Sequence, residues 1–119
     1  MEPVVLIMTT VGSEEQGIQI AQAGVERGQA ACVNKVKHKR SIYRWKGEIW
    51  DDDEYLLLIK TRESLFPAVR DTIRSLHSYE LPEVICVPAN KVDERVQGWI
   101  MDTTVQKERP QADKPSAKD

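Results

Sequence analysis

The feature that most constrains the fold is the stretch from residue 30 to 61, which has one turn signal in its middle. The segment AACVNKV is typical of the start of a strand, and the basic segment KVKHKRSIYRW continues it. Lys46 and Gly47 then turn the chain into the returning segment EIWDDDEYLLLIKT. Both arms are longer than a usual strand, so we expect a long β-hairpin that is bulged or twisted.

Before the hairpin, the sequence predicts one strand and one helix. The apolar run PVVLIMTTV, residues 3–11, predicts a strand that is buried on both faces. Ser13 predicts the N-cap of a helix, Gln16 occupies the capping-box position, and Gly28 predicts the helix end. Three apolar residues recur at helical spacing and predict the buried face of this helix: Ile18, Ala21 and Val25.

After the hairpin, the sequence predicts a second helix, a short strand and a third helix. Ser64 is the predicted N-cap of the second helix, where Pro67 is tolerated because it falls in the first turn. The predicted buried stripe of that helix is Phe66, Val69, Ile73 and Leu76. The segment EVICVPA, residues 83–89, predicts a strand, and VDERVQGWIMDTTV, residues 92–105, predicts a short helix.

The predicted order is therefore strand, helix, strand, strand, helix, strand, with one appended helix. This βαββαβ order is typical of the ferredoxin-like α+β fold, an antiparallel sheet with both helices on one face. We expect one domain over residues 1–106 and a disordered polar tail over residues 107–119. Apolar residues on both alternations of the strands predict that a second subunit covers the other face of the sheet.

Charge and hydropathy argue against several classes of protein. The formal net charge of −2 gives no overall electrostatic case for binding nucleic acid or an anionic membrane. The longest apolar run, residues 55–59, is too short to span a bilayer, and no secretory signal is expected. Cys32 and Cys86 lie in apolar surroundings without CxxC spacing, which favours reduced cysteines in a cytoplasmic protein.

Four blocks of the sequence resemble the CutA divalent-cation-tolerance family. They are AACVN at 30–34, SIYRWKGEI at 41–49, EYLLLIKT at 54–61 and HSYELPEV at 77–84, and the resemblance runs through residues 4–104. It implies a ferredoxin-like subunit, similar in fold to the PII proteins, that assembles as a homotrimer. The sheets would face inward and the long hairpins would reach across to neighbouring subunits. The resemblance also implies a role in copper or divalent-metal tolerance.

The segment SLHSYELPEVICVPA carries the candidate metal ligands. The resemblance implies copper ligands at the positions of Thr9, Leu76 and His77, of which only the histidine is a suitable ligand. Glu80 and Glu83 add oxygen ligands, so His77, Glu80 and Glu83 form the candidate set for a divalent metal ion such as copper. The same residues also suit an ordinary join between helix and strand, where a protonated His77 would complement the helix dipole.

A cleft between subunits is the second candidate site. Tyr43 and Trp45 share one face of their strand by period-two spacing, Lys60 ends the paired strand, and Tyr79 lies near the helix–strand join. The resemblance implies that these segments meet at a subunit boundary, where PII proteins bind effectors. The alternative is that Tyr43 and Trp45 only anchor the interface, because aromatic residues are enriched at such contacts.

The remaining motifs favour ordinary surface chemistry. The acidic run at 51–54 lacks the glycine and the distal acid of a calcium loop, so we expect it to be an exposed run of the hairpin. The basic run at 35–40 lacks the aromatic signature of RNA-binding sheets, so no nucleic acid partner is expected. The sequence has no phosphate loop, serine elbow or Cys–His pair at a telling spacing, so we expect no enzyme activity. Two functions stay open: a trimer that binds metal ions or a small effector, and a structural trimer for an unknown protein partner.

Overall fold

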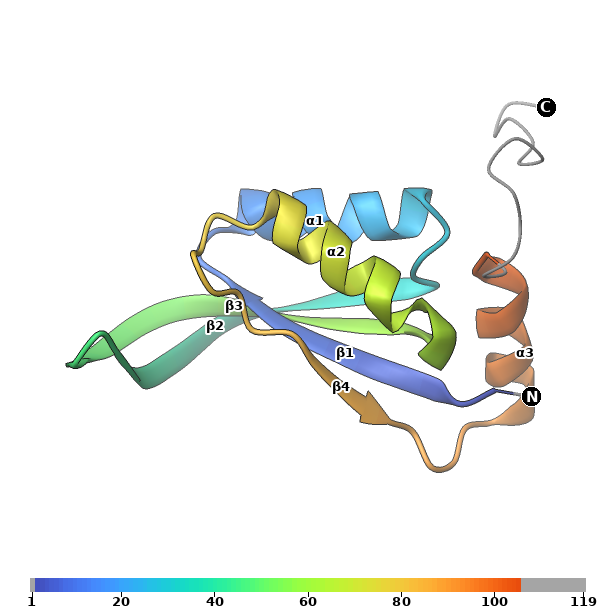
Figure 1. The fold of residues 1–119 in the computed structure, drawn as a ribbon. Helices are drawn as coiled ribbons and strands as arrows, with labels where there is room; N and C mark the ends of the chain where they lie inside the picture. Colours follow the sequence, from blue (N-terminus) through green and yellow to red (C-terminus); the bar gives the residue numbers. More distant parts are fainter. Residues whose placement is uncertain (1, 106–119) are drawn as a thin grey trace.

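The computed structural model describes residues 2–105, and its elements follow the predicted order (Figure 1). The strands and helices are β1 (Val4–Val11), α1 (Glu14–Glu26), β2 (Cys32–Trp45), β3 (Glu48–Arg62), the 3-10 turn η1 (Glu63–Leu65), α2 (Phe66–Leu76), β4 (Ile85–Pro88) and α3 (Glu94–Thr103). The tail predicted to be disordered, residues 107–119, lies outside the described residues, as does the predicted domain end at residue 106.

The four strands form one antiparallel sheet in the order β2-β3-β1-β4. Figure 1 shows α1 and α2 lying together over one face of this sheet, with α3 at the end where β1 begins. The predicted ferredoxin-like α+β fold is confirmed. None of the helices of residues 2–105 is long and apolar enough to cross a membrane.

β1 is buried on one face and half-buried on the other, rather than buried on both as its sequence predicts. Val5, Ile7 and Val11 face the two helices and join the main core. The alternate residues of β1 lie on the other side of the sheet. There, α3 covers only one end, where Ile100 packs against Val4. We call the rest of that side the open face. The strand register assigns to it Leu6, Met8, Thr10, Cys32, Asn34, Val36, Leu56, Leu58, Lys60, Ile85 and Val87.

The buried face of α1 differs from the predicted one. Ile18 and Val25 are each 45% exposed, and the buried residues are instead Gly17, Ile20 and Gly24. A Cβ added at Gly17 would lie 3.3 Å from a methyl of Val11, so the glycine lets the helix approach the sheet closely. A hydrophobic pattern misses this face because glycine carries no apolar side chain.

Of the two predicted N-caps, Ser13 is confirmed and Ser64 is wrong. Ser13 caps α1 as predicted, since its Oγ accepts from the backbone N–H of Gln16 at 3.2 Å. The Gln16 side chain does not return to the cap but joins the end of α2, where its Nε2 donates to the Leu76 carbonyl at 2.9 Å. Ser64 does not cap α2; it lies in η1, and α2 begins after Leu65 without a side-chain cap. The predicted stripe of α2 is fully buried only at Val69 and Ile73, while Phe66 and Leu76 pack half-buried against the core.

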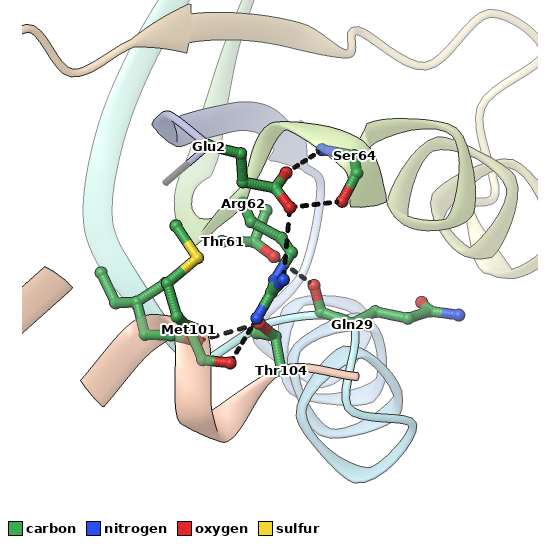
Figure 2. A network of polar contacts seen from close by, with 8 residues as sticks. Glu2, Gln29, Thr61, Arg62, Ser64, Met101 and Thr104 are labelled. Carbon is green, nitrogen blue, oxygen red and sulfur yellow. Dashed lines mark hydrogen bonds and ion pairs between the residues drawn. The ribbon is translucent and has the colours of Figure 1, made fainter. Parts of the chain in front are cut away.

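The buried guanidinium of Arg62 connects the two ends of the described chain (Figure 2). It donates from Nε to Thr104 Oγ1 at 2.9 Å, from Nη1 to Glu2 Oε1 at 3.2 Å, and from Nη2 to the Met101 carbonyl. The Glu2 carboxylate also accepts from the backbone N–H of Ser64 at 2.8 Å and from its hydroxyl at 3.1 Å. This network holds the start of the chain, η1 and α3 on the sheet.

The hairpin of β2 and β3 is bulged, as predicted. Its register shifts between Val36 and Lys39, and its turn residues Lys46 and Gly47 both have positive φ, 50° and 83°. Two residues with positive φ match the twist of the strands that they join. Figure 1 shows that the outer half of the hairpin projects beyond both helices.

Glu2 generates a prediction about stability and pH. Burial alone would raise the pKa of the Glu2 carboxyl, but hydrogen bonds from Ser64 and Arg62 outweigh it and lower the pKa below the ordinary 4.5. A carboxyl with a lowered pKa in the folded state stabilises the protein above its unfolded-state pKa, and this contribution is lost as the pH falls through the folded-state value. Glu2→Gln should therefore reduce the free energy of unfolding at pH 7 by about 1–2 kcal/mol.

Chemical denaturation of both proteins at matched concentration measures this difference. The gap between wild type and Glu2→Gln should shrink as the pH falls below 4.5, and Ser64→Ala, which keeps the backbone N–H, should lose less stability. A difference that does not change between pH 7 and pH 3 would show that the Glu2 charge is not what stabilises the network.

Candidate functional site

The segment between α2 and β4 connects the end of β1 to the hairpin. The imidazole of His77 contacts the Thr10 carbonyl at 2.7 Å, and the Tyr79 hydroxyl donates to Glu54 Oε2 at 2.6 Å. At the hairpin turn, Lys46 Nζ lies 3.1 Å from Glu80 Oε1. The loop residues that the sequence singled out therefore contact the hairpin at Glu54 and at its turn, and together they form one polar corner of the molecule.

His77 has both ring nitrogens engaged in hydrogen bonds. Its Nδ1 accepts from the backbone N–H of Tyr79 at 3.1 Å, so Nε2 carries the proton and donates to the Thr10 carbonyl. The predicted interaction of a protonated His77 with the helix dipole stays a prediction. A metal ion would have to displace one of these two hydrogen bonds.

The three candidate metal ligands do not converge within one chain. Glu80 and Glu83 are exposed, and Glu80 is paired with Lys46. Across residues 2–105, no three side chains of His, Cys, Asp or Glu lie close enough to hold an ion. The set His77, Glu80 and Glu83 therefore does not fit a metal ion inside one chain, and a site completed by a second chain stays a prediction.

The positions that the resemblance assigns to two copper ligands lie in the core. Thr9 is completely buried beside Ile7 and Val11, and its Oγ1 is the one enclosed side-chain oxygen or nitrogen of the described residues without a partner. Leu76 packs half-buried against the core. Neither side chain offers copper a suitable ligand atom.

Two tyrosines each donate to a carboxylate on the open-face side of the sheet. Tyr43 donates to Asp52 Oδ2 at 2.6 Å, and that bond, with partial desolvation and the charge of Asp52, raises the pKa of Tyr43 to about 12. Burial and the bond to Glu54 raise the pKa of Tyr79 as well. Both phenols therefore stay protonated and act as donors at neutral pH. We call Tyr43, Asp52, Glu54 and Tyr79 the tyrosine–carboxylate site.

The predicted cleft residues are divided between two ends of the sheet. Tyr43 and Tyr79 belong to the tyrosine–carboxylate site, and Trp45 lies half-buried at the hairpin end with Lys46 Nζ 5.6 Å from its ring centroid. Lys60 pairs in register with Leu6 and Cys32 at the other end of the open face. The cleft predicted between subunits is thus not complete in one chain and stays a prediction.

Glu54 is the residue of this corner that the sequence prediction missed. The run 51–54 is expected to be exposed, and Asp51 and Asp53 are, but Glu54 is only 4% exposed. Period-two spacing places Glu54 on the same face as Leu56 and Leu58. That alternation was the available signal, because an acid in phase with apolar neighbours lies on their side of the strand.

Comparison with known proteins identifies the family. A family model described as CutA1 divalent ion tolerance protein matches residues 5–103. The divalent-cation tolerance protein CutA of Thermus thermophilus is 44% identical over 104 residues, which cover 87% of this chain and 99% of the relative. The chain belongs to the CutA1 family. Human Protein CutA is 43% identical to this CutA1 chain over 95 residues, which cover 80% of the chain but only 53% of the human protein.

Solved CutA1 structures share the fold. The crystal structure of CutA1 from Oryza sativa superimposes with a TM-score of 0.86 at 35% identity and covers 89% of this chain and 97% of the rice chain. The divalent cation tolerance protein of Thermus thermophilus superimposes with a TM-score of 0.83 at 39% identity and covers 86% and 99% of the two chains. The resemblance found in four sequence blocks is therefore confirmed over most of the CutA1 fold.

The unpartnered hydroxyl of Thr9 generates a second prediction. A buried hydroxyl without a hydrogen bond costs about 1–3 kcal/mol, so the nearly isosteric Thr9→Val should raise the free energy of unfolding by about 1 kcal/mol. Thr61→Val is the matched control, because Thr61 is equally buried on the paired strand but donates to the Gln29 carbonyl at 2.6 Å. Thr61→Val should lower stability. Chemical denaturation measures the free energy of unfolding of both variants. If Thr9→Val lowers it as much as Thr61→Val does, the Thr9 hydroxyl has a hydrogen-bond partner.

Proposed function

We propose that this CutA1 protein is a cytoplasmic homotrimer that acts in divalent-cation tolerance without enzymatic activity. It binds a metal ion such as copper, or a small effector, at clefts between its subunits. The observation that carries the proposal is the open face, an apolar sheet surface that the chain's own helices leave uncovered.

The open face supports assembly through its composition. Most of its side chains are apolar, and Val36, Ile85 and Val87 on it are exposed in the single chain. An apolar patch of this extent on a soluble protein marks an interaction surface. A second copy is a suitable cover, because it presents the same surface, and the number three follows from the resemblance to the trimeric family.

The projecting hairpin supports the same conclusion. Ile42 and Ile49 are 70% and 67% exposed on one face of its outer half, and Tyr43 lies opposite the exposed Trp50 on the other. Their own sheet cannot bury these side chains because the hairpin extends beyond it. A neighbouring subunit would bury both faces of the hairpin.

The tyrosine–carboxylate site supports the binding of a cation or a polar effector. It presents two carboxylates and two phenolic hydroxyls next to the exposed Glu80, with Glu83 and His77 in the adjoining loop. Such oxygens suit divalent ions of the harder kind, and the names of several relatives refer to divalent-cation tolerance. The free cysteines Cys32 and Cys86 are consistent with a reducing, cytoplasmic location.

The alternative is a structural trimer that presents its surface to a protein partner. The two hydrogen bonds of His77 and the burial of Thr9 and Leu76 favour it, because they remove the ligand set that the resemblance implies for copper. In that case the clefts are packing features only.

Sedimentation equilibrium and equilibrium dialysis test the proposal together. The wild-type protein should sediment as a trimer at micromolar concentration, and a folded monomer would contradict the assembly. Dialysis against copper and zinc should show binding that weakens in His77→Ala and in Glu83→Gln, with the exposed Glu26→Gln of α1 as control. A trimer that takes up neither ion would favour the structural alternative.

A further inference from the structure

Glu54 is a buried carboxylate that forms no ion pair with the side chains that the structure describes. It is 4% exposed, and the hydroxyl of Tyr79 is its hydrogen-bond donor. None of the ion pairs among the described residues includes it, although Lys39 stands opposite it in the register of β2 and β3. Buried carboxylates are normally paired with a cation or fully hydrogen-bonded.

The hydrogen bond from Tyr79 engages one of the two carboxylate oxygens of Glu54. Oε2 accepts from Tyr79, and Oε1 has no hydrogen bond to the described residues. Among the described side chains, the enclosed oxygen or nitrogen without a partner is Thr9 Oγ1, and Glu54 Oε1 is not such an atom. By register, Glu54 lies on the side of Leu56 and Leu58, which belong to the open face.

Lys60 is the opposite charge on the same face. It is half-buried, it stands in register between Leu6 and Cys32, and it takes part in no ion pair of the described residues. Lys60 and Glu54 are six positions apart along β3, which separates them by about 20 Å. The two groups therefore cannot meet within one chain.

We propose that Lys60 of one copy pairs with the Glu54 carboxylate of a neighbouring copy, where Tyr79 supplies the second donor. The inference rests on the proposed assembly through the open face. When one open face covers another, the half-buried Lys60 and the buried Glu54 lose what contact with water they have, and a charge of opposite sign from the neighbour compensates for this loss.

This pairing also explains the division of the predicted cleft. Within one chain, Tyr79 and Lys60 lie at opposite ends of the open face. In the assembly, the first chain supplies Glu54 and Tyr79 to the site, and a neighbouring copy supplies Lys60. The site is incomplete without the second chain, and the symmetry of a closed ring would repeat it at every interface.

A double-mutant cycle tests the pair. Lys60→Met and Glu54→Gln remove one charge each with little change in shape, and Glu54→Gln keeps an oxygen for the Tyr79 hydroxyl. Each single variant should raise the trimer dissociation constant, measured by sedimentation equilibrium, on the order of tenfold or more, because the remaining charge is left buried and unpaired. The double variant should be no weaker than the weaker single variant. Lys39→Met, which removes the lysine opposite Glu54 in the same chain, is the matched control and should leave assembly unchanged.

The outcomes separate this inference from the proposed assembly. A wild-type protein that is a folded monomer would overturn both. A wild-type trimer in which the effects of Lys60→Met and Glu54→Gln simply add would overturn the pairing and leave the trimer standing. If the effects of Glu54→Gln and Lys39→Met on trimer dissociation are not additive, Glu54 pairs with Lys39 of its own chain, and the inference is overturned. Far-ultraviolet circular dichroism at high concentration confirms that each variant has folded.

Discussion

Two helices cover one face of this four-stranded sheet, whereas the opposite face is covered only at one end. This difference between the two faces determines where the chain leaves apolar surface exposed. α1 and α2 bury the alternation of β1 that contains Val5, Ile7 and Val11, while α3 reaches only the end of the other face. The remaining surface is mostly apolar and lies next to a hairpin that extends beyond both helices (Figure 1). Burying apolar surface is the dominant favourable term in folding and association, so this chain has a strong physical reason to assemble.

The polar groups follow the same division between the two faces. Arg62 and Glu2 hold the end of the sheet where α3 covers it (Figure 2), and their hydrogen bonds lie within the chain. Glu54 and Lys60 lie on the uncovered part and lack ionic partners among the described residues. Arg62 and Glu2 at the covered end are therefore paired within one chain, whereas Glu54 and Lys60 form no ion pair with the side chains that the structure describes.

Element order and the hairpin could be predicted because they depend on local signals. Alternation, the turn at Lys46 and Gly47, and the Ser13 cap each act within a few residues. The buried face of α1 could not be predicted from hydropathy, since it is formed around Gly17 and Gly24, which leave room instead of adding apolar surface.

The site was less predictable because its contacts join residues far apart in the sequence. The sequence identified Tyr43, His77 and Tyr79 as candidate site residues, but it did not predict their hydrogen-bond partners. Tyr79 bonds Glu54, 25 positions away, and the His77 ring bonds the Thr10 carbonyl, 67 positions away. The occupied ring nitrogens of His77 follow only from the loop conformation, so a metal site read from residue types alone overlooks this competition.

If other copies of the chain cover the open face in solution, they should protect the thiol of Cys32 from chemical reagents. Cys32 is half-buried and pairs in register with Lys60 on that side of the sheet, whereas Cys86 pairs with Ile7 on the helix side. In a Cys86→Ser variant, Cys32 is the one remaining thiol, and its rate of reaction with a maleimide can be followed in native buffer and in denaturant. We expect the native rate to be slower by orders of magnitude than the denatured rate. A folded protein in which Cys32 reacts nearly as fast as in denaturant would show that the open face is not covered.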